Sequence, residues 1–153
     1  MSLTASGISY VGEISWGTHF CQFYNNRDDL VSSLVPYFKA GIDNNEKCLW
    51  VTADPFRADD ARAALKNAVP DLTEREKKGQ IEILNHEQWY TGNGVMDTPS
   101  VLKACASAEQ GALDKGFNGL RITGNTNQAK IFERFTQLEV GQNSALIRKS
   151  FGT

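Results

Sequence analysis

The sequence predicts an α/β domain of three layers, with a mostly parallel sheet between helices on both of its faces. Short apolar runs that suit strands alternate with segments whose apolar residues recur three and four positions apart, the spacing of one helix face. A strand–helix–strand order favours parallel strands joined by right-handed crossovers. Because 153 residues suit one domain, residues 1–153 are assigned to a single folding unit.

The first strand and the first helix are predicted from turn and capping signals. Residues 20–24 are rich in aromatic side chains and run into two asparagines, which favours a strand followed by a turn. Asp28 and Asp29 suit a helix N-terminus, where capping and the helix dipole favour acidic groups. Apolar residues follow at helical spacing, and Gly41 and the asparagine pair beyond it are stop signals. Pro36 counts against this helix because proline removes one internal hydrogen bond.

The middle of the chain predicts two further strands. Residues 48–52 form a continuous apolar run, as expected of a strand that is buried on both faces. Pro55 is expected to open a helix whose apolar stripe includes Leu65. The polar residues 73–79 then serve as a connection to a third strand at residues 81–84.

The last third begins with a predicted loop that contains Trp89 and Tyr90. Residues 98–116 have the pattern of a helix that starts at a Thr-Pro pair and stops at a glycine. A fourth strand is expected at residues 120–123, and residues 129–148 have apolar side chains at roughly helical spacing.

Composition limits the classes of function. The net charge of -2 argues against a nucleic-acid-binding surface, and no apolar run is long enough to span a membrane. We find no pattern of a signal peptide, and residues 1–3 resemble a cloning leader. The three cysteines are widely spaced without a CxxC pair, so we expect neither a disulfide framework nor a metal site. These features favour a cytoplasmic protein without a cofactor.

The ligand site of a parallel α/β sheet lies beyond the carboxyl ends of its strands. We therefore place the site where the four predicted strands end and in the loop after the third strand. The candidate ligand-binding residues are Tyr24, Asn25, Thr52, His86, Trp89, Tyr90, Arg121, Thr123 and Asn125.

The first strand-to-helix loop lacks the chemistry that binds phosphate. A Walker loop needs glycines for close backbone approach, a lysine for the phosphates and a hydroxyl for magnesium. Residues 25–29 contain no glycine and no lysine, and their two carboxylates would repel a phosphate. Nucleotide hydrolysis is therefore not expected.

His19 and Cys21 stand two positions apart and share one face of the first strand. Such a pair could act as a base and a nucleophile, or as two metal ligands. Side chains at this spacing stand about 6–7 Å apart and parallel, which makes direct pairing awkward. We favour a small buried cysteine and a hydrogen-bonding histidine, and we keep the functional pair as the alternative.

Two further groups each have a structural and a functional interpretation. The aromatic residues after His86 combine apolar surfaces with polar tips, which suits a small, weakly polar ligand, but Trp89 could equally pack the loop on the sheet. Arg121, inside a buried strand, needs a partner. That partner is either a helix carboxylate, with Glu139 as one candidate, or a ligand anion or carbonyl.

Several segments resemble the MEDS domain, the methanogen/methylotroph sensory domain, in order and over about residues 13–140. The segments are WGTHFCQFY (16–24) followed by Asp29-Leu30, VPYFKAG (35–41), NEKCLWVT (45–52), GQIEI (79–83), QWY (88–90) and GLRITGNT (119–126). The family-like positions are His19, Cys21, Tyr24, Trp50, Trp89, Tyr90, Arg121, Thr123 and Asn125.

The resemblance implies a sensory input domain of prokaryotic signalling rather than an enzyme. The family is attached to histidine kinases and DNA-binding domains, includes a dichloromethane-responsive repressor, and is proposed to sense simple hydrocarbon derivatives. Its fold is similar to the RecA/KaiC-like ATPase core without the Walker motifs. The output would then lie on another chain or on a missing segment. The alternative is a degenerate nucleotide-binding domain, or a domain that acts through oligomerisation, for example as a homo-oligomer.

The chain departs from the family pattern in two places. Residues 127–130 lack the aromatic side chain that usually follows the fourth strand. The family tends to place a strand after its last helix, so either the sheet is one strand short or residues 145–147 supply that strand.

Overall fold

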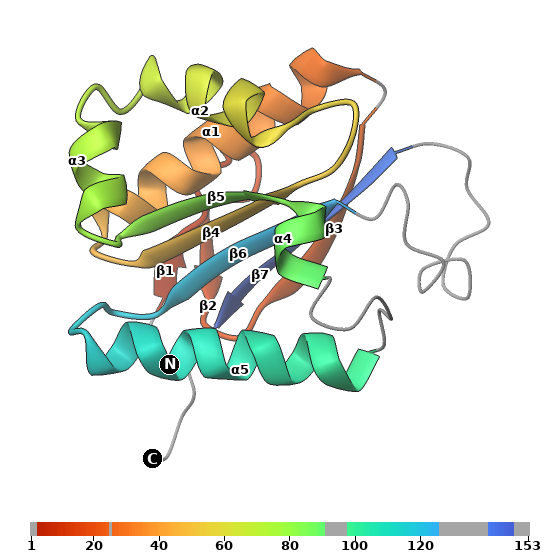
Figure 1. The fold of residues 1–153 in the computed structure, drawn as a ribbon. Helices are drawn as coiled ribbons and strands as arrows, with labels where there is room; N and C mark the ends of the chain where they lie inside the picture. The colour runs from red at the N-terminus through yellow and green to blue at the C-terminus, as the bar shows by residue number, and fades with distance from the viewer. Residues whose placement is uncertain (1–2, 25, 91–97, 126–140, 149–153) are drawn as a thin grey trace.

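A computed structural model describes residues 3–24, 26–90, 98–125 and 141–148 of the chain (Figure 1). The strands are β1 (Leu3–Ala5), β2 (Glu13–Ser15), β3 (His19–Tyr24), β4 (Lys47–Thr52), β5 (Ile81–Asn85), β6 (Leu120–Asn125) and β7 (Gly141–Arg148). The helices are α1 (Arg27–Asp43), α2 (Ala58–Lys66), α3 (Leu72–Lys77), α4 (His86–Tyr90) and α5 (Thr98–Asp114). Within these residues, no helix is both long and apolar enough to cross a lipid bilayer.

The main sheet has five strands in the order β3-β7-β6-β4-β5. Strand β4 is parallel to both β5 and β6. Strand β7 lies between β3 and β6 and is antiparallel to both, so β3 points the same way as the other three strands. The chain is therefore a mixed α/β protein in which β3, β4, β5 and β6 end at one edge of the sheet. We call this edge the carboxyl edge.

Strand β7 corrects the prediction for the end of the chain. We expected helical spacing through residue 148, whereas residues 141–148 form a strand. The alternative in which residues 145–147 supply a strand is confirmed. A short apolar run has no periodicity that separates a strand from a buried helix, which explains the error. Residues 129–140 of the expected helix lie outside the described residues.

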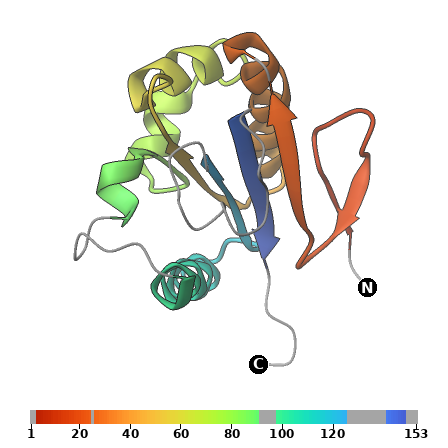
Figure 2. The same ribbon diagram turned by 90° about the vertical axis from the view of Figure 1, so that its right-hand side faces the viewer.

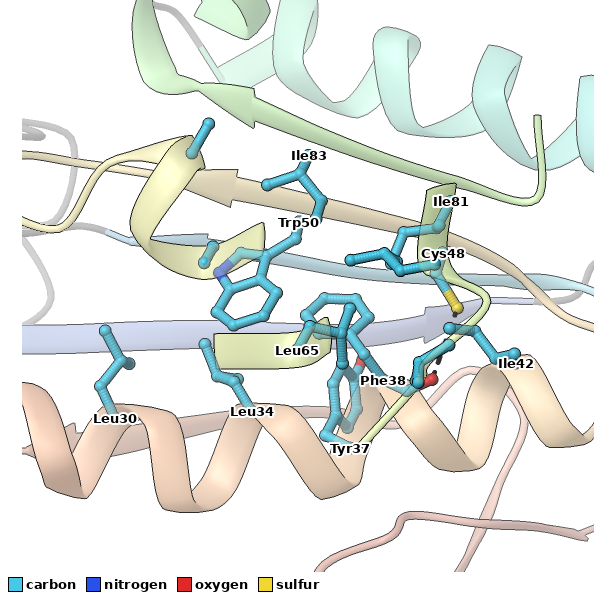
Figure 3. Close-up of a cluster of buried hydrophobic side chains, with 14 of the residues drawn as sticks. Leu30, Leu34, Tyr37, Phe38, Ile42, Cys48, Trp50, Leu65, Ile81 and Ile83 are labelled. Atoms are coloured by element: carbon cyan, nitrogen blue, oxygen red, sulfur yellow. Dashed lines mark hydrogen bonds between the residues drawn. The ribbon is translucent and has the colours of Figure 1, made fainter. Parts of the chain in front are cut away.

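Helices pack on both faces of the sheet and bury two separate clusters of apolar side chains (Figures 1 and 2). On one face, α1, α2 and α3 cover the side of β4 that carries Cys48 and Trp50. Figure 3 shows Leu34 and Phe38 of α1 directed at this face. On the other face, α5 packs against the alternate positions of β4 and β6, among them Leu49. Strand β4 is thus buried on both sides, as its continuous apolar run predicted.

Helix α1 begins as its sequence predicts and ends later than its glycine suggests. Asn26 is the N-cap, and its Oδ1 accepts a hydrogen bond of 2.9 Å from the Asp29 amide. Pro36 and Gly41 both lie inside the helix, which ends at Asp43. Gly41 is buried between α1 and the sheet, where it faces Arg121 and Cys48. The close packing explains the glycine at this position, and no turn is formed there.

Three element boundaries between residues 55 and 90 differ from the prediction. Helix α2 starts at Ala58 and not at Pro55, because the Phe56 amide donates to the Ala53 carbonyl in a turn. The supposed polar connection at residues 73–79 contains α3, and the supposed loop after β5 is α4. Both helices are short, at 6 and 5 residues, and too brief to show a helical period in the sequence.

The N-terminal residues form a hairpin of β1 and β2, on the side of β3 in Figure 2. Leu3 belongs to this hairpin and therefore takes part in the fold. Ile8 and Trp16 join the apolar cluster beneath α1. Gly7 has a positive φ of 82°, and a Cβ there would collide with the Pro36 carbonyl oxygen. The hairpin is therefore an integral part of the domain.

Candidate functional site

The carboxyl edge brings together the ends of β3, β4, β5 and β6, as the sequence predicted. Tyr24, Thr52 and His86 lie at or next to these strand ends. Asn25 lies outside the described residues. So do the side chains of His19, Cys21, Tyr90 and Asn125, whose backbones belong to β3, α4 and β6.

A hydrogen-bonded group joins the ends of β4 and β5 to the start of α2. Asn85 Oδ1 accepts a 2.9 Å hydrogen bond from the Ala58 amide, the first residue of α2. Thr52 Oγ1 lies 3.2 Å from the Leu84 carbonyl oxygen and 3.3 Å from Asn85 Oδ1. The backbone amide of Asn85 in turn donates a hydrogen bond of 2.9 Å to Gln88 Oε1. Thr52 and Asn85 thus hold this part of the edge together.

Replacing Asn85 with alanine is expected to destabilise the protein by about 0.5–2 kcal/mol, the usual cost of losing a helix-capping oxygen. The reason is that the Ala58 amide loses its acceptor at the α2 N-terminus. Urea unfolding followed by circular dichroism measures this change. Asn85→Asp keeps an acceptor at the same place and should retain most of the stability. An equal loss in both variants would contradict the capping role.

Charged side chains form a second group at the outer rim of the edge. Arg57 pairs with Asp54 and, at 3.3 Å, with Glu87 Oε1 of α4. The hydrogen bonds that Arg57 donates to Asp54, first, and to Glu87, second, raise the pKa of Arg57. The pKa of Glu87 is lowered, first by a hydrogen bond from its own backbone amide and also by Arg57. His86 Nδ1 lies 3.6 Å from Glu87 Oε2. The ion pair between Arg57 and Glu87 thus links the loop after β4 to α4.

Trp89 has a position that favours the structural interpretation. It lies on α4 and packs against the apolar cluster between the sheet and α5, to which Leu49 and Val51 belong. This is the packing role that we weighed against ligand contact.

Arg121 is fully buried and is held by the protein itself. Its Nε and Nη2 lie 2.9 and 3.1 Å from the two carboxylate oxygens of Glu46, which is a bidentate pair. Nη1 donates to the carbonyls of Ser6 at 3.1 Å and Tyr37 at 2.6 Å, and Nη2 donates to Ala5 at 2.7 Å. Each guanidinium nitrogen therefore has a protein partner, which favours the structural ion pair over a ligand anchor.

The partner of Arg121 differs from the one that we considered. Glu46 comes from the turn between α1 and β4 and not from a helix, and Glu139 lies outside the described residues. Thr4 Oγ1 and Asn44 Nδ2 each donate to Glu46 Oε2, at 2.8 Å. The ion pair thus links the N-terminal hairpin, the end of α1 and β6. No sequence signal pairs residues 75 positions apart, so the pair was missed.

The two cysteines with described side chains, Cys48 and Cys105, are buried thiols. Burial is the main reason that the pKa of Cys48 lies far above its usual value. A buried thiol of raised pKa is a poor nucleophile, which suits a structural cysteine. In the described part of the chain, no cluster of three or more metal-binding side chains occurs.

The fold and the carboxyl edge together define a mixed α/β domain whose first strand-to-helix turn is capped by its own Asn26. The family model of the MEDS domain, described as the methanogen/methylotroph, DcmR sensory domain, matches residues 18–151. The match covers most of the chain, so the chain belongs to the MEDS family. No curated protein and no solved structure matches the chain significantly. MEDS is a family of sensory domains, and a sensor role is consistent with that membership.

Proposed function

We propose that this domain is a cytoplasmic, non-catalytic input module that binds a small organic molecule at the carboxyl edge. The observation that carries the proposal is the α1 N-terminus, where Asn26 already caps the helix and Asp28 and Asp29 occupy the first turn. In nucleotide-binding α/β proteins, this helix end receives the phosphates. Here the Asp29 amide already has Asn26 as its acceptor, and the carboxylates of Asp28 and Asp29 repel anions, so a neutral or weakly polar ligand is favoured.

The family membership supports the sensory part of the proposal. In this account, the ligand is a simple hydrocarbon derivative, and the output is a histidine kinase or a DNA-binding domain that is joined to or bound by this one. Descent from a RecA/KaiC-like core that lost its Walker motifs belongs to the same proposal. The Asn26 cap at the α1 N-terminus supports it, because a domain without Walker motifs does not need this helix end to bind a phosphate.

A thermal-unfolding screen tests the proposal. The compounds are short alcohols, halomethanes, methylamines and carboxylates, because the family proposal concerns simple hydrocarbon derivatives. At least one compound is expected to raise Tm in a saturable way, since a ligand that binds only the folded state stabilises it by mass action. An unrelated monomeric protein in the same solvents controls for solvent effects. If no compound raises Tm, the binding proposal fails.

A further inference from the structure

Two neighbouring polar groups on the α1 side of the sheet lack hydrogen-bond partners in the described structure. Thr123 of β6 is 1% exposed, and its Oγ1 is buried without a partner. Trp50 of β4 is also 1% exposed, and no hydrogen bond joins its indole nitrogen to a described residue. The two residues are register partners on adjacent parallel strands, so their side chains stand on the same face next to each other.

Orphaned polar groups of this kind are uncommon in folded proteins. Most buried donors and acceptors are paired, and each exception calls for an explanation. An unpaired buried hydroxyl costs about 1–3 kcal/mol of desolvation. Thr123 Oγ1 is such a group, whereas Arg121 and Tyr37 on the same side of the sheet hydrogen-bond to other protein groups.

The described neighbours of Trp50 on the side of the predicted ligand edge are apolar. Leu30 and Leu34 of α1 face the sheet near Trp50, and Figure 3 shows the indole nitrogen turned toward the Leu30 end of α1. That end is the carboxyl edge, where α1 begins. Phe56 packs on the Trp50 ring with centroids 6.0 Å apart. A small molecule at this place would meet aliphatic and aromatic walls with two polar groups between them.

The charges nearby are already paired, which limits the class of ligand. Arg121 lies two residues from Thr123 on the same strand face, and Glu46 neutralises it. Arg27 lies over the Phe56 ring at the rim, with Asp60 at 3.8 Å. An ionic ligand would therefore lose its hydration without gaining a free counter-charge.

From this geometry we infer that Trp50 and Thr123 form the polar part of a ligand subsite beneath α1, for a small neutral molecule with a hydrogen-bond acceptor, such as a short alcohol or ketone. The inference rests on the proposed sensor function and gives it a place and a ligand class. The indole N–H donates to the acceptor, and the Thr123 hydroxyl either donates or accepts. Because Leu30 and Leu34 cover this face, occupancy acts directly on α1.

Side-chain indole resonances in a ¹H–¹⁵N spectrum test the inference with ethanol, 2-propanol and acetone as neutral probes. Acetate and methylammonium serve as charged probes. The protein has three tryptophans, and Trp50→Phe identifies the Trp50 signal by its loss. Neutral probes should shift the Trp50 signal in a saturable way, whereas the signals of Trp16 and Trp89 and the effect of the charged probes stay small.

Substitutions of Thr123 provide the second readout. Thr123→Val should fold with a Tm near that of the wild type, because the lost hydroxyl has no partner, and should lose the probe-induced shifts of Trp50 and of Tm. Thr123→Ser keeps the hydroxyl and should keep the shifts. Thr73→Val removes an exposed hydroxyl of α3 and should also keep them. Stabilisation that survives in Thr123→Val, or vanishes in Thr73→Val, places the ligand elsewhere and overturns this inference while the sensor proposal stands. If none of the compounds binds the wild type, the sensor proposal fails as well.

Discussion

Replacing Glu46 with alanine is expected to destabilise the domain by about 3–5 kcal/mol, because it leaves the Arg121 charge buried without its counter-ion. Both side chains are 0% exposed, so water cannot take the place of the carboxylate without opening the structure. Glu46 also accepts from Thr4 and Asn44, so the N-terminal hairpin loses an anchor at the same time. Denaturant unfolding at neutral pH measures the change.

A surface ion pair supplies the matched control for this experiment. Lys39 and Asp43 form an i,i+4 pair at 2.6 Å on α1, with both side chains about half exposed. Asp43→Ala is expected to cost only about 0.3–0.5 kcal/mol, since solvent screens the pair. Similar losses for Glu46→Ala and Asp43→Ala would show that the Arg121–Glu46 pair is not a structural centre of the domain.

Gly41→Ala is expected to destabilise the domain by about 1–3 kcal/mol through overpacking, although Ala is the better helix former. A Cβ at this position would lie 2.8 Å from Arg121 Cδ and 2.9 Å from both Arg121 Nε and Cys48 Sγ. The Arg121 side chain cannot move away easily, because its nitrogens are held by Glu46 and by main-chain carbonyls. Thermal and denaturant unfolding both report the loss.

Gly111 is the matched control, since it also lies inside a long helix. A Cβ there meets no atom within 4 Å. Gly111→Ala is therefore expected to stabilise the protein by up to about 1 kcal/mol, the difference in helix propensity. If both substitutions stabilise the protein, the close packing of α1 against Arg121 is wrong.

Local patterns were sufficient to predict the central elements of the fold. The apolar run at residues 48–52, the spacing of apolar residues after Asp29 and the strand at residues 81–84 all correspond to elements of the structure. Each has either a clear period or a continuous apolar run, which are the strongest signals in a single sequence. Their order also predicted the edge at which the strands end.

The parts that could not be predicted depend on contacts between distant residues. The antiparallel insertion of β7 between β3 and β6 follows from pairing across the chain, for which the local pattern carries no information. The same holds for Arg121, whose partners at residues 5, 6 and 46 lie 75 or more positions away. The Asn85 cap on α2 was missed for a related reason, since its acceptor comes from β5 and not from the residue before the helix.

The direct test of the sensor account is calorimetric titration of the wild-type protein with two classes of compound. One class is the neutral alcohols and ketones, and the other is ATP and GTP with magnesium. The account predicts a saturable heat of binding for at least one neutral compound and none for either nucleotide, because the α1 N-terminus is capped by Asn26 and flanked by acidic residues. Saturable binding of a nucleotide, with none of the organic compounds, would contradict it.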